Sequence, residues 1–344
     1  MLKIKHLIII LISLILLSCS SKGDTLSVMQ FNIWQEGTSV ENGFEGIVDN
    51  IINVNPDMVT FSEVRNYNNT DFIGRLVDAL SQKGYFYNGR SSISTGLISK
   101  YPITEQTVIY PLKNDAGSIT KASIDVNGKT VALYSAHLDY RHYACYLPRG
   151  YDGSTWEKME APITDVDSIL TQNRKSFRQK AINAFIEESK KEIEKGNIVI
   201  IGGDFNEPSH LDWTDKTKNL WDHNGAMIEW EVSKSLYNSG FKDTYREYYP
   251  DVINYPGFTF PSDNESVDTS KLTWAPESDE RDRIDFIYYY PSSNISLQKS
   301  IMVGPSMSIV KNKRVKEEGK EDFILPVGTW PTDHKALVTT FVIN

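Results

Sequence analysis

Short apolar runs alternate with amphipathic segments along the chain after residue 25. Such runs are typical of strands, and apolar residues that recur every three or four positions are typical of helices. The predicted strands cover residues 26–33, 58–61, 95–99, 119–126, 130–137, 198–201, 284–290 and 336–343. The predicted helices cover residues 44–52, 72–80 and about 167–195. This mixture predicts an α/β or α+β domain.

Local signals show how neighbouring elements connect. Asn127-Gly128 lies between two predicted strands and favours a two-residue hairpin turn. Gly196 ends the long helix, and the continuous apolar run 198–201 predicts a strand buried on both faces. The strongly charged stretch 311–322 predicts a solvated loop. Residues 139–164 break the pattern because tyrosines and a tryptophan are interleaved with arginines, glycines and prolines, and they predict a long aromatic loop.

The first 18 residues differ from the rest of the chain. Two lysines and a histidine precede the apolar stretch 7–17, which is the layout of a secretory signal and is too short to span a bilayer comfortably. The residues around Cys19, Leu-Leu-Ser-Cys, resemble the bacterial lipobox, in which the cysteine is lipidated after cleavage. The alternative is an ordinary signal with an incidental cysteine.

The sequence therefore predicts three segments. Residues 1–18 are expected to be a lipoprotein signal peptide and residues 19–25 a lipidated, flexible tether. Residues 26–344 contain no internal repeat and no linker, and predict a single domain with an insertion at about 139–164. We expect a monomer attached to the bacterial cell envelope by lipid at Cys19, at the outer membrane or facing the periplasm or the exterior.

Composition narrows the class of protein. The chain is 40% hydrophobic and 24% charged, an ordinary globular composition that excludes disordered and polytopic membrane proteins. Its net charge of −9 becomes −11 if Lys3 and Lys5 leave with the signal, since 34 basic residues then face 45 acidic ones. This charge argues against tight non-specific binding to a polyphosphate, although a local basic groove is still allowed. Apart from Cys19, Cys145 is the only cysteine, so a lipidated chain forms no intrachain disulfide.

The strongest local motif is Gly202-Gly203-Asp204-Phe205-Asn206, where a buried strand opens into a loop. Active sites of α/β proteins are built at such strand ends. A carboxylate at Asp204 suits a hard cation or the orientation of a water molecule, and the amide of Asn206 suits a phosphate oxygen. Taken alone, the motif is also explained by a turn with an Asx cap.

Other polar residues occupy predicted strand ends in the same way. They are Asn32, Glu63, His137, Asp285, Asp333 and His334. Each one by itself is equally explained as a cap or as a buried polar group with its hydrogen bonds satisfied.

Together these residues resemble the endonuclease/exonuclease/phosphatase superfamily, in matching order from about residue 27 to 343. The segment 94–103 is similar to the scaffold segment of that family. The resemblance implies a four-layer α/β/β/α sandwich with two central, mostly antiparallel sheets, and a site at one end where strands converge. It also implies catalytic roles for His137, Asp204, Asn206, Asp285 and His334, and metal binding near Asn32, Glu63 and Asp333.

The resemblance further implies a divalent metal, Mg²⁺ or Mn²⁺. In-line attack on a phosphate ester needs an activated water and neutralisation of charge on the non-bridging oxygens. A hard cation held by carboxylates supplies that neutralisation. The sequence contains no pattern of cysteines and histidines with zinc spacing.

Three functions compete. The favoured one is hydrolysis of a small, carbohydrate-linked or lipid-linked phosphate ester in the cell envelope. A nuclease acting on DNA or RNA is the alternative, which the acidic charge disfavours, and a catalytically silent binding module is disfavoured because every site position keeps its expected residue type. The aromatic loop is expected to form one wall of the pocket, or to cover the core instead. Its candidate substrate contacts are Tyr140, Arg141, His142 and Trp156.

Overall fold

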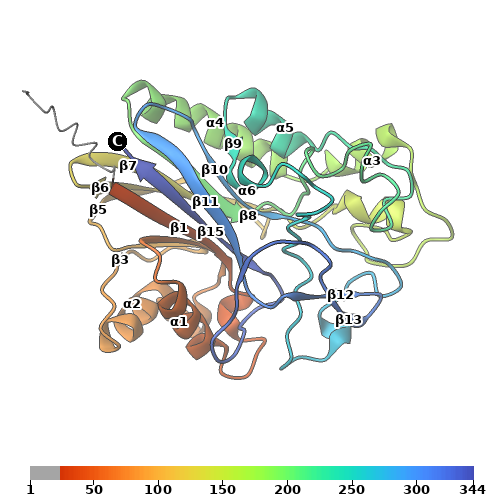
Figure 1. Cartoon of the computed structure of the whole chain (residues 1–344), viewed down its shortest axis with the longest axis horizontal. Helices are drawn as coiled ribbons and strands as arrows, with labels where there is room; N and C mark the ends of the chain where they lie inside the picture. Colours follow the sequence, from red (N-terminus) through yellow and green to blue (C-terminus); the bar gives the residue numbers. More distant parts are fainter. Residues whose placement is uncertain (1–23) are drawn as a thin grey trace, which may run out of the picture.

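The computed structural model describes residues 24–344 as four layers, with two β-sheets face to face and helices on both outer faces (Figure 1). The predicted α+β sandwich is therefore confirmed. Residues 1–23 lie outside the described part of the chain, so the signal, the tether and Cys19 stay predictions. Within residues 24–344, no helix has both the length and the apolar character needed to cross a membrane.

The first sheet has seven strands in the order β14-β11-β15-β1-β2-β4-β3. The β1–β2 and β11–β14 pairs are parallel and the others are antiparallel. Its strands are β1 (Asp24–Asn32), β2 (Met58–Val64), β3 (Asn88–Gly89), β4 (Ser94–Ser99), β11 (Ile295–Val303), β14 (Phe323–Ile324) and β15 (Ala336–Ile343).

The second sheet has six strands in the order β5-β6-β7-β8-β10-β9, and only its β7–β8 pair is parallel. Its strands are β5 (Ile103–Tyr110), β6 (Gly117–Val126), β7 (Lys129–Leu138), β8 (Ile198–Asp204), β9 (Lys242–Asp243) and β10 (Asp285–Tyr289). A separate hairpin consists of β12 (Met307–Val310) and β13 (Lys313–Lys316).

Helices cover each sheet from outside (Figure 1). Helices α1 (Gly43–Val54) and α2 (Phe72–Gln82) pack on the first sheet, and α4 (Arg178–Glu194) and α5 (Glu231–Asn238) pack on the second. The remaining helices are α3 (Val166–Asn173), α6 (Thr244–Tyr248) and the short 3₁₀ turns η1 (Gln35–Gly37), η2 (Tyr67–Asn69), η3 (Ala144–Arg149) and η4 (Thr269–Lys271).

Alternating side chains of each central strand fill two different cores. In β1, Val28 points between the sheets and Met29 points toward α1 and α2. In β8, Ile200 lies between the sheets and Ile201 packs toward α4. This two-residue period is what a strand buried on both faces requires, as the run 198–201 predicted.

Close to one end of the sandwich, the space between the sheets becomes narrow and polar. A Cβ atom on Gly202 would lie 2.4 Å from Oγ1 of Thr60 on the opposite sheet, so only glycine fits there. The Ser62 hydroxyl donates to the Ala136 carbonyl, and the Ser135 hydroxyl donates to the Phe61 carbonyl. These bonds cross from one sheet to the other and fix their relative position.

The sequence prediction did not include β5, β11 or α5, and three further segments differ from it. The segment 167–195, predicted to be one helix, forms the two helices α3 and α4. Between them the Ser176 hydroxyl donates to the Asn173 carbonyl, and this local bond interrupts the helical backbone hydrogen bonds. The segment 311–322, predicted to be a solvated loop, contains β13. Its Glu317 accepts a hydrogen bond from the buried Lys335. The insertion at 139–164 contains η3.

Candidate functional site

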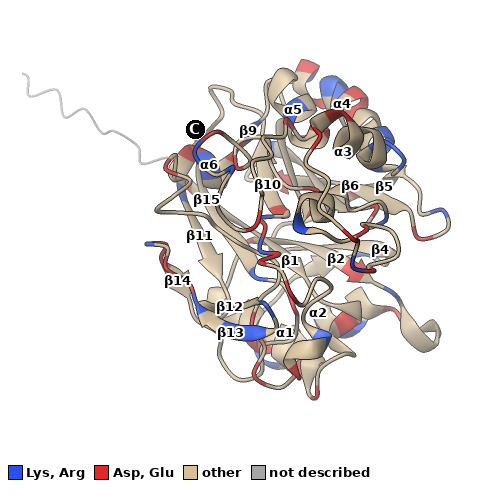
Figure 2. Cartoon of the chain, turned by 90° about the vertical axis from the view of Figure 1, so that its right-hand side faces the viewer, with Lys and Arg blue, Asp and Glu red and all other residues tan. Residues whose placement is uncertain are grey.

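The candidate site lies at the end of the sandwich where strands of both sheets terminate. The first sheet supplies Asn32 and Glu63, and the segment entering β15 supplies Asp333 and His334. The second sheet supplies the row His137, Asp204 and Asp285, which are direct neighbours across β7, β8 and β10. Figure 2 views the molecule from this side and shows acidic and basic segments around the ends of the central strands. The structure therefore brings all the predicted metal and catalytic residues together.

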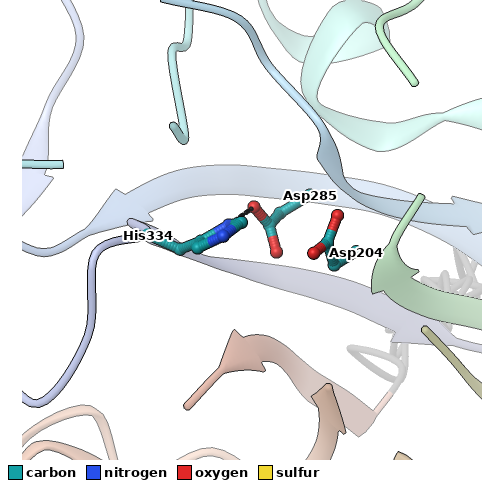
Figure 3. A group of neighbouring side chains, drawn as sticks. All are labelled: Asp204, Asp285 and His334. Carbon is teal, nitrogen blue, oxygen red and sulfur yellow. Dashed lines mark hydrogen bonds and ion pairs between the residues drawn. The ribbon is translucent and has the colours of Figure 1, made fainter. Parts of the chain in front are cut away.

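The His334 ring is fixed by one carboxylate. Its Nδ1 atom lies 2.8 Å from Oδ2 of Asp285, which is fully buried, and Figure 3 shows Asp204 on the far side of that carboxylate. Burial opposes the charged ring, but the charge and hydrogen bond of Asp285, together with the charges of Asp204 and Asp333, outweigh burial and raise the pKa of His334 to about 10. His334 is therefore an imidazolium at neutral pH, and its Nε2 atom lies 3.9 Å from Oδ1 of Asp333.

Asp204 sits in a dry, acidic environment. Its Oδ2 accepts a hydrogen bond from the Asn32 amide at 2.9 Å, and its Oδ1 accepts one from the Asn206 backbone N–H at 2.9 Å. Burial, with added repulsion from Asp285, raises the pKa of Asp204 to about 8. A carboxyl group whose pKa lies near neutrality is suited to accept a proton from water.

Asn206 follows the strand end in a left-handed conformation, with φ of 48°. Its amide donates to the Leu138 carbonyl at 3.0 Å, which holds the side chain at the edge of the site. Asn tolerates this conformation better than most residues. The Asn206 side chain therefore faces the cavity without adding a charge.

Glu63 is turned into the cavity by its backbone. Its φ is 72°, and the pairing register between β2 and β4 shifts between Ser62 and Val64. Such a bulge redirects a side chain at the rim of a sheet. Oε2 of Glu63 accepts the Gln35 backbone N–H at 3.0 Å, so the carboxylate is held in place while still facing the cavity.

Asp333 and His137 complete the ring of polar groups. Burial, together with the nearby charge of Glu63, raises the pKa of Asp333 to about 7. Burial also lowers the pKa of His137, so this ring is neutral at pH 7. Nδ1 of His137 lies 3.0 Å from the Ser94 hydroxyl, which leaves Nε2 for the cavity.

These groups surround a cavity of about 290 Å³. Asn32 and Asp285 are fully buried behind it and act through their neighbours. The side chains that line it are Trp34, Gln35, Glu63, Arg65, Asp115, His137, Tyr140, Tyr143, Tyr146, Trp156, Asp204, Asn206, Phe260, Trp274, Ile284, Asp333 and His334.

The predicted substrate contacts divide into two pairs. Tyr140 and Trp156 line the cavity, whereas Arg141 and His142 do not. The Arg141 guanidinium donates to the neighbouring Asp139 carboxylate at 2.8 Å, and the His142 ring lies 2.9 Å from the Ser154 hydroxyl. Both side chains are held within the insertion and its surroundings, so the structure places them outside the cavity.

Sequence reasoning missed part of the cavity wall. Arg65 lies two residues after Glu63, and its guanidinium is 2.7 Å from the Asp115 carboxylate at the rim. Arg65 follows the last residue of β2 and the bulge at Glu63, so the alternation of strand faces gave no signal for it. Phe260 and Trp274 come from the stretch 249–283, in which the hydrophobic pattern predicted no element.

Two buried arginines fasten the aromatic insertion to the sandwich. Arg178 at the start of α4 donates to the backbone carbonyls of Asp139, Arg141 and His142. Arg149 at the end of η3 pairs with the Asp282 carboxylate at 2.5 Å. The insertion is therefore a fixed wall of the site.

The cavity-facing carboxylates fit a divalent cation. Glu63 and Asp333 lie close enough for the charge of Glu63 to raise the pKa of Asp333, and both face the cavity. Carboxylate oxygens are the ligands that Mg²⁺ and Mn²⁺ prefer. Asp204, Asp285 and His334 form a second group whose ligand atoms lie within 4.8 Å of one another, in which Nδ1 of His334 and Oδ2 of Asp285 are hydrogen-bonded to each other. The Asn32 amide donates to Glu63 at 3.3 Å, so Glu63 and Asp333 stay the predicted ligand pair.

Comparisons with known proteins agree with this geometry. The family model described as "Endonuclease/Exonuclease/phosphatase family" matches residues 29–334. An uncharacterized protein of Caenorhabditis elegans is 30% identical over 291 residues, which cover 82% of this chain and 85% of that protein.

Solved structures show the same fold at low sequence identity. The human nocturnin catalytic domain with bound sulfate gives a TM-score of 0.52 at 17% identity, covering 93% of this chain and 94% of that one. Truncated Caenorhabditis elegans TDP2 gives 0.51 at 17% identity, covering 92% and 97%. Because the family model spans most of the chain, the protein belongs to the endonuclease/exonuclease/phosphatase family, a family of phosphodiester hydrolases that generally depend on a divalent metal.

Proposed function

We propose that this protein is a divalent-metal-dependent hydrolase of a small phosphate ester, linked to a carbohydrate or a lipid, in the cell envelope. The observation that carries the proposal is the pairing of one imidazolium, His334, with a ring of buried carboxylates around one cavity. Without a cation, Glu63 and Asp333 would repel an anionic phosphate. With a bound cation, the same carboxylates hold a positive charge that attracts the phosphate.

The chain supplies most parts of the reaction itself. A bound Mg²⁺ or Mn²⁺ at Glu63 and Asp333 would neutralise charge on the phosphate. Asp204 orients the attacking water and accepts its proton in the ionised form, which a neighbouring divalent cation would favour over the burial that raises its pKa. His334 donates from its cationic ring to a non-bridging oxygen as negative charge grows there. Asp285 keeps that ring charged and correctly oriented.

One neutral group adds to the recognition of the phosphate. His137 offers Nε2 because Ser94 occupies its other nitrogen, whereas the Asn206 amide nitrogen is bonded to Leu138 and Asp204 and holds the strand end in place. Neutral donors bind a phosphate oxygen without competing with the metal for the carboxylates. Arg65 at the rim supplies one more positive charge, partly balanced by Asp115.

A nuclease is the second candidate. Among similar solved structures is TDP2 from D. rerio complexed with a single-strand DNA product, with a TM-score of 0.50 and 15% identity. Two observations argue against a polymeric substrate. The chain has a net charge of −9, and Arg65 is the only lysine or arginine among the described residues that line the cavity. Binding of a nucleic acid backbone needs several such charges.

The decisive experiment measures the turnover of phosphate esters by residues 20–344 with Mg²⁺ or Mn²⁺, with and without a chelator. The substrates are glucose 1-phosphate, inositol phosphates, sphingomyelin, bis-p-nitrophenyl phosphate, plasmid DNA and RNA. Chelator-sensitive cleavage of small esters with DNA intact supports the proposal, and nicked plasmid at low protein concentration favours the nuclease. Asp204→Asn should abolish turnover, whereas Asp167→Asn on the exposed side of α3 is the matched control.

We also propose that lipid at Cys19 attaches the protein to a membrane, as a monomer facing the periplasm or the exterior. The support is the sequence around Cys19 alone. Cys19→Ala should release the protein into the soluble fraction of fractionated cells. A variant that stays in the membrane fraction would refute the anchor and leave the phosphoesterase proposal untouched.

A further inference from the structure

A wall of aromatic side chains stands opposite the polar groups of the cavity. Trp156 lies between Tyr146 and Trp274, with a ring-centroid distance of 5.6 Å to each. Trp274 lines the cavity and is 50% exposed, so half of its surface is accessible. Aromatic faces of this kind bind the apolar side of a ring-shaped ligand.

One buried carboxylate joins the two segments that form the wall. Glu280 accepts hydrogen bonds from the Tyr146 hydroxyl and from the backbone N–H groups of Trp274, at 3.2 Å, and Ala275, at 3.1 Å. The insertion and the loop that carries Trp274 are thus fixed relative to each other. A wall held in this way is formed before any ligand arrives.

Trp156 is fixed by a tight turn. Its backbone N–H donates to the Asp152 carbonyl at 2.9 Å, and its φ is 65°. The turn packs against Tyr143 so closely that a Cβ on Gly153 would lie 2.2 Å from the Tyr143 carbonyl oxygen. Gly153 is therefore required for the approach, and the turn places the indole over the tyrosines.

Tyr143 adds an unused hydrogen-bonding group. This side chain is 4% exposed and lines the cavity, yet within residues 24–344 its hydroxyl has no oxygen or nitrogen partner. The thiol of Cys145, a weak hydrogen-bonding group, is its polar neighbour. A buried hydroxyl normally finds a strong partner, so this one points to a ligand or water that belongs in the cavity.

We propose that Trp156, Trp274 and the Tyr143 hydroxyl form a subsite for a six-membered polyol ring, a sugar or cyclitol, that carries the phosphate ester. The inference rests on the proposed function because the ring lies on the aromatic wall only while its phosphate meets His334. The C–H face of the ring covers an indole, and a ring hydroxyl bonds to Tyr143.

The chemistry of the wall favours a polyol over a nucleobase. Amide side chains are the usual readers of the edge of an adenine base. Of the two amides among the described lining residues, Asn206 is bonded to Leu138 and Gln35 accepts from the Tyr67 hydroxyl. The volume, about 290 Å³, lies just below the range for small-molecule pockets, about 300–1,000 Å³, which fits one ring with its phosphate.

The test is calorimetric binding of glucose 1-phosphate, myo-inositol 1-phosphate, AMP and glycerol 3-phosphate to the Asp204→Asn protein, which prevents turnover. All four are phosphate monoesters, and glycerol 3-phosphate is the acyclic control. We expect the two ring polyols to bind at least about tenfold more tightly than glycerol 3-phosphate. Equal binding of all four would overturn the proposal, and tightest binding of AMP would replace the polyol by a nucleoside.

Variants assign the preference to the wall. Trp156→Ala and Trp274→Ala should each remove the tenfold preference while binding of glycerol 3-phosphate stays unchanged. Tyr143→Phe should lower affinity for ring polyols without loss of thermal stability, since its hydroxyl has no strong partner to lose. Tyr237→Ala, which removes an exposed tyrosine of α5, is the control. Wall variants that keep the preference would contradict the assignment.

The two proposals fail in different ways. Metal-dependent turnover of esters without any ring preference would refute the subsite and leave the hydrolase. Ring-selective binding without turnover of any substrate would refute the hydrolase and leave the subsite.

Discussion

The Nδ1 atom of His334 lies 2.8 Å from Oδ2 of Asp285, and the carboxylate of Asp204 faces the same aspartate from the other side (Figure 3). Asp285 is fully buried, so its charge acts on His334 through little screening solvent. The pair is the means by which a buried ring stays positively charged beside the phosphate position.

Asp285→Asn should lower turnover at least about a hundredfold, the scale of losing one electrostatic stabiliser. It should also change the pH profile. In the native protein the pKa of His334 is about 10, so the imidazolium persists as pH rises until about 10. In the variant the pKa returns toward its usual value of about 6.5, and activity should decline from near neutrality. Measurement of kcat from pH 5 to 10 tests this, and an unchanged alkaline limb would contradict the role of Asp285.

Glu63→Gln and Asp333→Asn should raise the Mg²⁺ concentration needed for half-maximal activity. Each replacement removes a charged ligand oxygen from the cavity, and even groups that only support a ligand cost about tenfold or more in metal affinity. Metal titration of turnover measures the change. Glu41→Gln, at an exposed position, is the control, and unchanged metal dependence in both site variants would move the metal to other ligands.

Ser62→Ala should weaken the packing of the two sheets beneath the site. The Ser62 hydroxyl accepts from Gln30 at 3.1 Å and from the Asp204 backbone at 3.0 Å, and donates to Ala136 on the other sheet. Loss of these buried bonds should cost about 1–3 kcal/mol of unfolding free energy. It should also lower kcat several-fold because Asp204 loses its support. Ser300→Ala removes a buried hydroxyl elsewhere and should lower stability without changing kcat.

Arg178→Met should loosen the aromatic insertion. The guanidinium serves three backbone carbonyls and lies 3.4 Å from the buried Glu207, so its removal leaves these groups without their partner. Breaking a buried ion pair in this way costs about 3–5 kcal/mol. Limited proteolysis should then cut between residues 139 and 164, and unaltered resistance to protease would show that the insertion is held by other contacts. Arg174→Met, whose partner Glu231 lies at the surface, is the control.

Acid should destabilise the scaffold through Glu192. Burial alone would raise the pKa of this carboxyl, but hydrogen bonds from Lys195, Asn197 and Lys121 lower it to about 2. A lowered pKa stabilises the fold above about pH 4.5, and that contribution, on the order of 3 kcal/mol, is lost as pH falls toward 2. Thermal melts of Glu192→Gln should therefore change less between pH 5 and 2 than those of the native chain.

The sequence was sufficient to predict the sandwich and to select the polar residues that meet at its end. The strand that ends at Asp204 is a continuous apolar run, and each other polar residue interrupts or follows such a run, so local pattern and family order agreed. The bulge that turns Glu63 into the cavity was not predictable, because it depends on the register between β2 and β4.

The substrate side of the site was harder to predict. Arg141 and His142 have side chains suited to a phosphate, yet local bonds to Asp139 and Ser154 hold them elsewhere. Trp274 lies more than a hundred residues after Trp156 in the sequence, and only Glu280 and the packing of the loops bring the two indoles together. Contacts of such long range leave no periodic signal.

The strand order has a consequence for the newly made chain. β15, the last strand, lies in the interior of the first sheet between β1 and β11, and His334 enters the site just before it. A growing polypeptide therefore lacks His334, and its first sheet is incomplete, until residues 334–343 have been synthesised. A chain that ends before residue 334 lacks the histidine on which the proposed chemistry depends, however well its other strands fold.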